Sequence, residues 1–229
     1  MIPTGQDERV SEEAMIPCYR FWVDDADAVG EAMAKLLPPQ ENFALVRESG
    51  EAGPGAAHYF GLAPDDIEGA ARLALVPVRT QTASESPLAL IRAASRIALD
   101  LSGIAGCRAV GWTPAQSAMD PAYFRSVAGQ WLQGGAFPAL GLVALLEDEA
   151  GNLSTLGLAT ICGQELVLAA EAAPAKVERA RIAIRMIDHL VSAGPMPRGE
   201  ALEIDGFGMF EARPDETGKK IYLRRSPFP

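Results

Sequence analysis

The stretch of sequence that decides the fold reads LGLVALL from Leu140 to Leu146, DEAGN from Asp148 to Asn152 and STLGLATI from Ser154 to Ile161. Two apolar and β-branched runs on either side of a Gly-Asn turn predict an antiparallel β-hairpin. Parallel strands need a longer crossover, usually a helix, so this short connection argues against a doubly wound sheet. The stretch therefore predicts a mixed or antiparallel sheet.

Helices and further strands alternate on both sides of this hairpin. Apolar residues at helical spacing, with capping residues or proline before them and proline or glycine after them, predict helices. Aromatic and β-branched runs predict strands. The expected helices span 24–36, 86–101, 120–131 and 174–193, and the expected strands 16–23, 43–46, 58–60, 73–78, 107–112, 165–168, 202–204 and 220–223. The expected fold class is α+β (mixed α/β), with about four helices packed on a mostly antiparallel or mixed sheet.

Residues 1–229 are expected to form one compact α/β domain, because a chain of 229 residues is long enough to bury a core of its own. An alternative divides the chain into two halves, 14–80 and 86–229, since the polar stretch Thr80–Glu85 is the best candidate boundary. Residues 1–13 carry charge without an apolar period, and we expect them to be flexible.

The chain is acidic, with a formal net charge of −10. This charge argues against nucleic-acid binding, which relies on a basic surface. Four cations near the C-terminus, Lys219, Lys220, Arg224 and Arg225, flank the strand-like Ile221–Leu223. They predict an edge strand protected by charge, with a weak anion site as the alternative.

Cysteine usage and the absence of an apolar leader indicate a cytoplasmic protein. Cys18, Cys107 and Cys162 lie far apart in apolar, strand-like runs, which favours reduced core thiols. The N-terminus has no basic region followed by an apolar stretch, and no apolar run approaches the roughly 18 residues that a membrane helix needs. We expect no membrane association.

A search for catalytic motifs finds no phosphate loop, no dinucleotide fingerprint, no nucleophile elbow and no zinc motif. His58 and His189 are the two histidines, and both are interpreted as surface residues. The acids Asp24, Asp25 and Asp27 cap a helix better than they match a calcium loop, whose sixth position here is Val29. No catalytic, metal-binding or cofactor-binding residue is therefore assigned.

Three residues form the candidate binding surface. Trp112 ends a strand beside a loop, where α/β sheets form pockets, although core packing is the more common role of such a tryptophan. Glu165 begins a strand, and Asp205 stands at the lip of a glycine-rich turn. We expect a pocket near Trp112, Glu165 and Asp205 if the chain binds a small molecule.

The second half of the chain, roughly residues 105–215, resembles the bacterial domain-of-unknown-function family 4261. The resemblance rests on the order and spacing of Val110–Trp112, Pro121–Phe124, Thr155–Leu158, Cys162–Leu166, the long helix with Gly194, and Asp205–Gly208. It implies a mixed α/β fold and a bacterial cytoplasmic setting, and it implies no established catalytic residue.

Three hypotheses about function follow. The first is a non-enzymatic interaction protein that binds a protein partner or its own copy, for which an exposed final strand could supply an edge. The second is a small-molecule binding or sensing domain at the candidate surface. The third is a carboxylate hydrolase that uses Glu165 and Asp205.

Overall fold

The computed structural model describes residues 18–37, 43–48, 56–77, 86–173 and 175–226. The flexible segment expected at residues 1–13 and the boundary expected at Thr80–Glu85 lie outside these residues. Within them the fold is mixed α+β, as predicted, with two six-stranded sheets that each combine parallel and antiparallel pairs.

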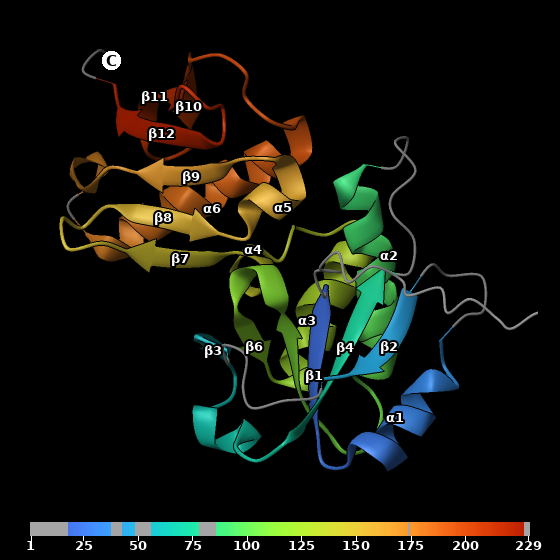
Figure 1. Cartoon of the computed structure of the whole chain (residues 1–229). Coiled ribbons are helices and arrows are strands. Elements are labelled where there is room, and N and C mark those ends of the chain that lie inside the picture. Colours follow the sequence, from blue (N-terminus) through green and yellow to red (C-terminus); the bar gives the residue numbers. More distant parts are fainter. Residues whose placement is uncertain (1–17, 38–42, 49–55, 78–85, 174, 227–229) are drawn as a thin grey trace, which may run out of the picture.

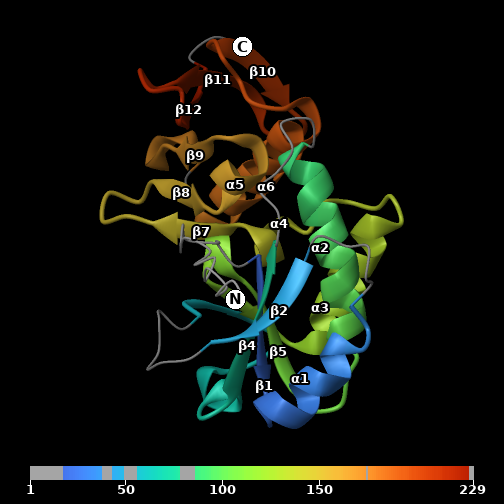
Figure 2. The same ribbon diagram turned by 45° about the vertical axis from the view of Figure 1, so that its right-hand side comes forward.

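The first sheet, sheet A, is built mainly from the N-terminal half of the chain. Its strands are β1 (Tyr19–Val23), β2 (Phe43–Arg47), β3 (His58–Phe60), β4 (Ala71–Pro77), β5 (Cys107–Trp112) and β6 (Ser117–Met119), in the order β2-β4-β1-β5-β6-β3. Three helices accompany it: α1 (Ala26–Ala34), α2 (Pro87–Leu101) and α3 (Pro121–Leu132). Four of its strands pair antiparallel in the order β2-β4-β1-β5. Together with α1 and α2 they follow one another in the chain as β1-α1-β2-β4-α2-β5, which is the split βαβ arrangement of ferredoxin-like folds. Figure 2 shows α2 and α3 on one face of this sheet.

The N-termini of these helices are set by local sequence. The side chain of Asp25 accepts hydrogen bonds from the backbone N–H groups of Asp27 and Ala28, and Asp120 caps α3 in the same way. Ser86 caps α2, with Pro87 at its first helical position. The capping interpretation of the Asp24–Asp27 run is therefore confirmed for Asp25, whereas Asp24 and Asp27 pair with Arg108 and Arg47.

The second sheet, sheet B, consists of two three-stranded meanders joined by the long helix α6 (Lys176–Ala193). Its strands are β7 (Ala144–Glu147), β8 (Leu153–Leu156), β9 (Glu165–Leu168), β10 (Glu200–Ile204), β11 (Gly208–Pro214) and β12 (Lys220–Arg225), in the order β10-β11-β12-β9-β8-β7. The central strands β9 and β12 run parallel, and α6 lies behind β8 and β9 in Figure 1.

The predicted hairpin is confirmed as β7–β8, but both of its strands are shorter than expected. Residues before β7 form the short helix α4 (Ala139–Leu142), and residues after β8 form α5 (Leu158–Cys162). Gly157 separates β8 from α5 with a φ of 97°, which glycine adopts without strain. Cys162 therefore lies in a helix and not in the strand that its apolar neighbours suggested. Short 3₁₀ helices η1 (Pro64–Ile67), η2 (Thr113–Ala115) and η3 (Ala170–Ala172) complete the described elements.

The prediction that the final strand lies at a sheet edge is wrong. β12 pairs with β11 on one side and with β9 on the other, so its backbone is enclosed within sheet B. Its exposed Lys220, Tyr222 and Arg224 alternate with the buried Ile221 and Leu223, which face the core. The sequence did not predict β11, and this missed strand takes the place beside β12. The edge strands of sheet B among the described residues are β10 and β7.

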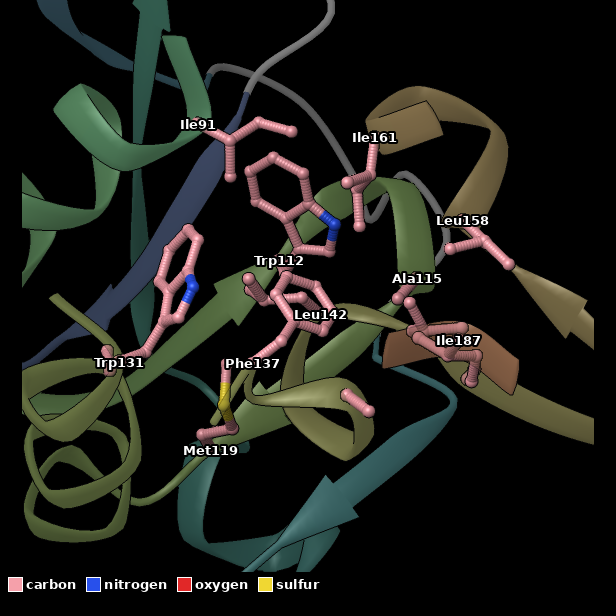
Figure 3. Close-up of a cluster of buried hydrophobic side chains, with 14 of the residues drawn as sticks. Ile91, Trp112, Ala115, Met119, Trp131, Phe137, Leu142, Leu158, Ile161 and Ile187 are labelled. Carbon is pink, nitrogen blue, oxygen red and sulfur yellow. The ribbon is translucent and has the colours of Figure 1, made fainter. Parts of the chain in front are cut away.

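One cluster of buried side chains includes residues from both sheets. Figure 3 shows its centre, where Trp112 of sheet A lies near Leu158 and Ile161 of α5 and Leu142 of α4. Gly157 supports this approach of the two sheets, because a Cβ on it would lie 3.1 Å from the backbone of Pro114 and Ala115.

An ion pair at the start of α6 makes stability sensitive to acid. Lys176 lies 2.6 Å and Arg179 2.8 Å from the carboxylate of Glu147 on β7. Their hydrogen bonds hold the pKa of Glu147 below its ordinary value of about 4.5. A carboxylate whose pKa falls on folding stabilises the fold above its unfolded pKa, and this stabilisation is lost as the pH falls through the folded pKa.

We therefore expect the urea midpoint of the wild-type protein to fall more steeply below about pH 4.5 than that of Glu147→Gln, because the amide has no proton to take up. Urea unfolding between pH 7 and pH 3 measures both curves. Parallel curves for the two proteins would show that this ion pair does not contribute.

Candidate functional site

Trp112 lies in the core and lines no open surface. Its side chain is 1% exposed, and its ring lies 5.0 Å from the ring of Tyr19, centroid to centroid. Figure 3 shows the indole between Ile91 and Ile161. The indole Nε1 has no hydrogen-bond partner among the described residues. In this position Trp112 supplies buried area between the sheets.

Glu165 holds the backbone around α5. One of its carboxylate oxygens accepts hydrogen bonds from the N–H groups of Gly157 (2.9 Å) and Ala159 (3.0 Å), and the other accepts from the hydroxyl of Thr155. Both oxygens are thus engaged by the protein itself. Glu165 acts as a cap for the first turn of α5, a role in which a carboxylate satisfies otherwise unpaired N–H groups.

Gln164, next to it, is also a structural residue. Its side chain is buried and donates to the carbonyls of Met196 (2.9 Å) and Gly218 (2.8 Å), and it accepts from the N–H of Met196 (2.7 Å). It therefore joins the loop after α6 to the turn before β12. The Gly-Gln-Glu-Leu segment, which contributed to the sequence resemblance, is explained here by hydrogen bonds that hold the fold.

Asp205 lies in a different place, in the turn between β10 and β11. There it lines a hollow of about 380 Å³ between α6 and β10, which we name the α6–β10 groove. The groove is lined by Arg185, Met186, Asp188, His189 and Ser192 from α6, and by Leu202, Glu203, Ile204 and Asp205 from β10 and its turn. Neither Trp112 nor Glu165 lines it, so the structure does not bring the three candidate residues together in one hollow.

The groove follows from the amphipathic patterns of its two walls. α6 buries a stripe that includes Met186 and Leu190 and leaves Arg185, Asp188 and His189 exposed. β10 buries Ile204 and exposes Glu203, its neighbour in the strand. The apolar side chains of the two elements pack together, and their polar side chains project along the rim.

The charged side chains and the imidazole of the groove have no partners within the part of the chain that the structure describes. None of Arg185, Asp188, His189, Glu203 and Asp205 forms a hydrogen bond or an ion pair there. Some other exposed acids, such as Asp24, Asp27 and Glu31, do pair with a cation. A row of unpaired charges beside an open strand can accept ligand contacts without first losing internal ones.

β10 adds main-chain groups to this site. It is the last strand of sheet B, so among the described residues no strand pairs with its outer side. The N–H and C=O groups on that side can pair with another chain. The groove thus combines a free sheet edge, an apolar floor and a charged rim.

Two further hollows lie on the same sheet. One, of about 550 Å³, is formed by Gly199–Ala201 with Glu211–Pro214, along β10 and β11. The other, of about 450 Å³, is lined by Glu211, Arg213, Tyr222 and Arg224 on the sheet face. Arg213 is already paired with Glu211 at 2.8 Å, which reduces its availability to a ligand. The first hollow extends the candidate surface along β10.

The cysteines of the described residues are buried or half-buried thiols. Burial raises the pKa of the thiols of Cys18 to about 11 and Cys107 to about 12, and it also raises the pKa of Cys162. Thiols with raised pKa values are poor nucleophiles at neutral pH. No cluster of three His, Cys, Asp or Glu side chains in the described ranges could hold a metal ion, and none of the helices there is long and apolar enough to cross a membrane.

The fold and the site together define an α+β protein in which, among the described residues, an open sheet edge lies beside a long helix. Comparison with known proteins adds no relative: no family model, no curated protein and no solved structure matches the chain.

Sequence reasoning singled out some groove residues and missed others. It interpreted His189 as a surface residue and placed Asp205 at the lip of a turn. It did not select Glu203 or Ser192. The alternation of Leu202, Glu203 and Ile204 did carry the signal of a half-exposed strand, but the nearness of this strand to α6 is a tertiary feature.

Proposed function

We propose that this chain is a non-enzymatic interaction protein, and that the α6–β10 groove binds an extended segment of a protein partner. The observation that carries the proposal is a strand edge that is free, and flanked by charged side chains without internal partners, in the part of the chain that the structure describes. Extended peptides commonly add a strand to such an edge, where main-chain hydrogen bonds supply affinity and side-chain pockets supply specificity.

Pairing of β10 with a second copy of itself is disfavoured by charge. Glu200 and Glu203 are both exposed on this five-residue strand, and self-pairing would bring the acids of two copies to one seam. Charged side chains on edge strands are a common means of preventing such pairing. A different protein is therefore the better partner, and a homodimer is the alternative.

The small-molecule and hydrolase alternatives have weaker support. The enclosed Trp112 offers no wall to a ligand, and both oxygens of Glu165 are occupied by hydrogen bonds. Asp205, the second carboxylate of the proposed hydrolase pair, lines a groove that Glu165 does not line. A protein-binding surface does not require Trp112, Glu165 and Asp205 to lie close together.

Filling the groove is expected to abolish partner binding. Ser192 is exposed on the groove side of α6, so Ser192→Trp occupies the space that a partner strand needs without changing the core. Partners captured by the tagged wild-type chain from cells of its source should be lost with this variant. Hydrogen exchange of the purified complex should show protection of the amides of Glu200–Ile204.

The matched control is Ser126→Trp, which places the same bulk on an exposed serine of α3. It is expected to bind partners like the wild type. Equal binding by all three proteins, or protection confined to other segments, would refute the proposed surface. A strict monomer that captures no partner at all would refute the interaction function itself.

A further inference from the structure

We infer that the segment bound in the α6–β10 groove alternates basic and apolar residues, with lysine or arginine on the side facing solvent. This inference rests on the proposed function and adds to it the chemistry of the partner. It is drawn from three properties of the groove: its charge, its floor and its strand geometry.

The rim of the groove is acidic. Asp188, Glu203 and Asp205 supply three carboxylates against the single guanidinium of Arg185. None of these side chains is paired within the described residues, so a cationic ligand would displace no internal partner. Hydrogen bonds between a cation and a carboxylate are about twice as strong as neutral ones.

The whole molecule reinforces this preference. With a net charge of −10, the chain attracts a basic segment over distances longer than a contact and repels an acidic one. Screening limits this attraction to about 8 Å at physiological ionic strength. Binding is therefore expected to weaken as salt is added.

The floor of the groove is apolar. Leu202, which is half-buried, supplies most of its accessible apolar surface, because Met186 and Ile204 beside it are only 1% and 5% exposed. Successive side chains of a strand added to β10 point to opposite faces of the sheet. One set of its side chains would therefore lie against this floor beside α6, and the other set would lie beside Glu203, which is exposed.

The length of the site follows from β10. Its five residues span about 17 Å at the rise of an extended strand. A partner segment of about five residues would use the whole edge. The acidic rim also distinguishes this partner from a second copy of the chain, whose own β10 carries Glu200 and Glu203.

Three synthetic ten-residue peptides test the inference, each alternating valine with lysine, with glutamate or with threonine. Binding to the full chain is followed by fluorescence anisotropy at low and at physiological salt. The lysine peptide is expected to bind at least tenfold more tightly than the glutamate peptide, to lose affinity with salt and to protect the amides of Glu200–Ile204 from exchange.

A charge reversal provides the specific control. Glu203→Lys is expected to weaken binding of the lysine peptide about tenfold and to improve binding of the glutamate peptide. Glu68→Lys makes the same change at an exposed position near η1 and is expected to leave both affinities unchanged.

The outcomes separate this inference from the proposed function. Equal binding of the three peptides with protection of β10 would overturn the charge preference and leave the sheet edge as the binding site. No binding of the lysine peptide, or binding unchanged by Glu203→Lys, would also overturn the inference. The proposed binding surface fails separately, if Ser192→Trp keeps the captured partners, and the interaction function fails if the chain is a strict monomer that captures no partner.

Discussion

Replacing Trp112 with alanine is expected to lower the free energy of unfolding by about 3–5 kcal/mol, the cost typical of removing a large buried aromatic side chain. Trp112 is 1% exposed and stands where the cores of the two sheets meet. Alanine would leave a cavity next to Tyr19, whose ring now lies 5.0 Å away. Urea unfolding followed by circular dichroism measures the loss.

Trp112→Phe is the informative comparison. The phenyl ring keeps most of the buried apolar area, and the change removes an indole N–H that has no partner among the described residues. A buried donor without a partner costs free energy, so its removal offsets part of the lost packing. We expect Trp112→Phe to cost less than half as much as Trp112→Ala. If Trp112→Ala were as stable as the wild type, this result would contradict the enclosed position of the side chain.

Gly111→Ala is expected to destabilise the protein by about 1–3 kcal/mol or more, the range found for overpacked cores. A Cβ at this position would lie 2.5 Å from the carbonyl oxygen of Ser117 and 2.6 Å from the ring of Trp22. The contact with Ser117 is to backbone, so relief requires β5 and β6 to move apart. The thermal midpoint and the urea midpoint should both fall.

Gly30→Ala makes the same chemical change where the structure has space. A Cβ there would meet the side chain of Leu73 at 3.5 Å, an ordinary contact, and the residue lies inside α1. Alanine is favoured over glycine in a helix interior by about 0.5–1 kcal/mol. Gly30→Ala should therefore be neutral or stabilising. The packing argument fails if the two glycines respond alike.

These variants also distinguish structural residues from binding residues. Trp112, Gln164 and Glu165 support the fold, and changing them should lower stability and binding together. Ser192 and Glu203 lie on the groove, and changing them should alter binding while the unfolding midpoint stays near that of the wild type. If Ser192→Trp loses binding while its unfolding midpoint stays near that of the wild type, the loss is due to the groove and not to an unstable fold.

The interaction hypothesis stated from the sequence assigned the free edge to the wrong strand. The basic residues around Ile221–Leu223 suggested an exposed strand, yet β12 pairs on both sides. Charge on alternate residues marks a strand with one solvated face, and an interior strand of a half-exposed sheet has such a face as well. Only the partners of β12 distinguish the two cases, and β9 lies more than fifty residues away in the chain.

Local sequence determined the four longer helices, α1, α2, α3 and α6, together with most of the strands and the fold class, but not the short helices α4 and α5. Caps at Asp25, Ser86 and Asp120 set helix starts, and the turn at Asp148–Asn152 set the β7–β8 hairpin. Signals of this kind act over a few residues, through side-chain hydrogen bonds to nearby N–H groups and through the period of apolar residues.

The tertiary structure alone decided the order of the strands, the burial of Trp112 and the position of the groove. Each of these depends on which distant segments share a surface: Ile91 of α2 and Ile161 of α5 lie on either side of the tryptophan, and α6 lies beside β10. Pairing and packing between such segments are stabilised by the apolar area they bury together, which no short stretch of the chain contains. For that reason the sequence indicated Asp205 and His189 singly, and only the folded chain places them in one groove.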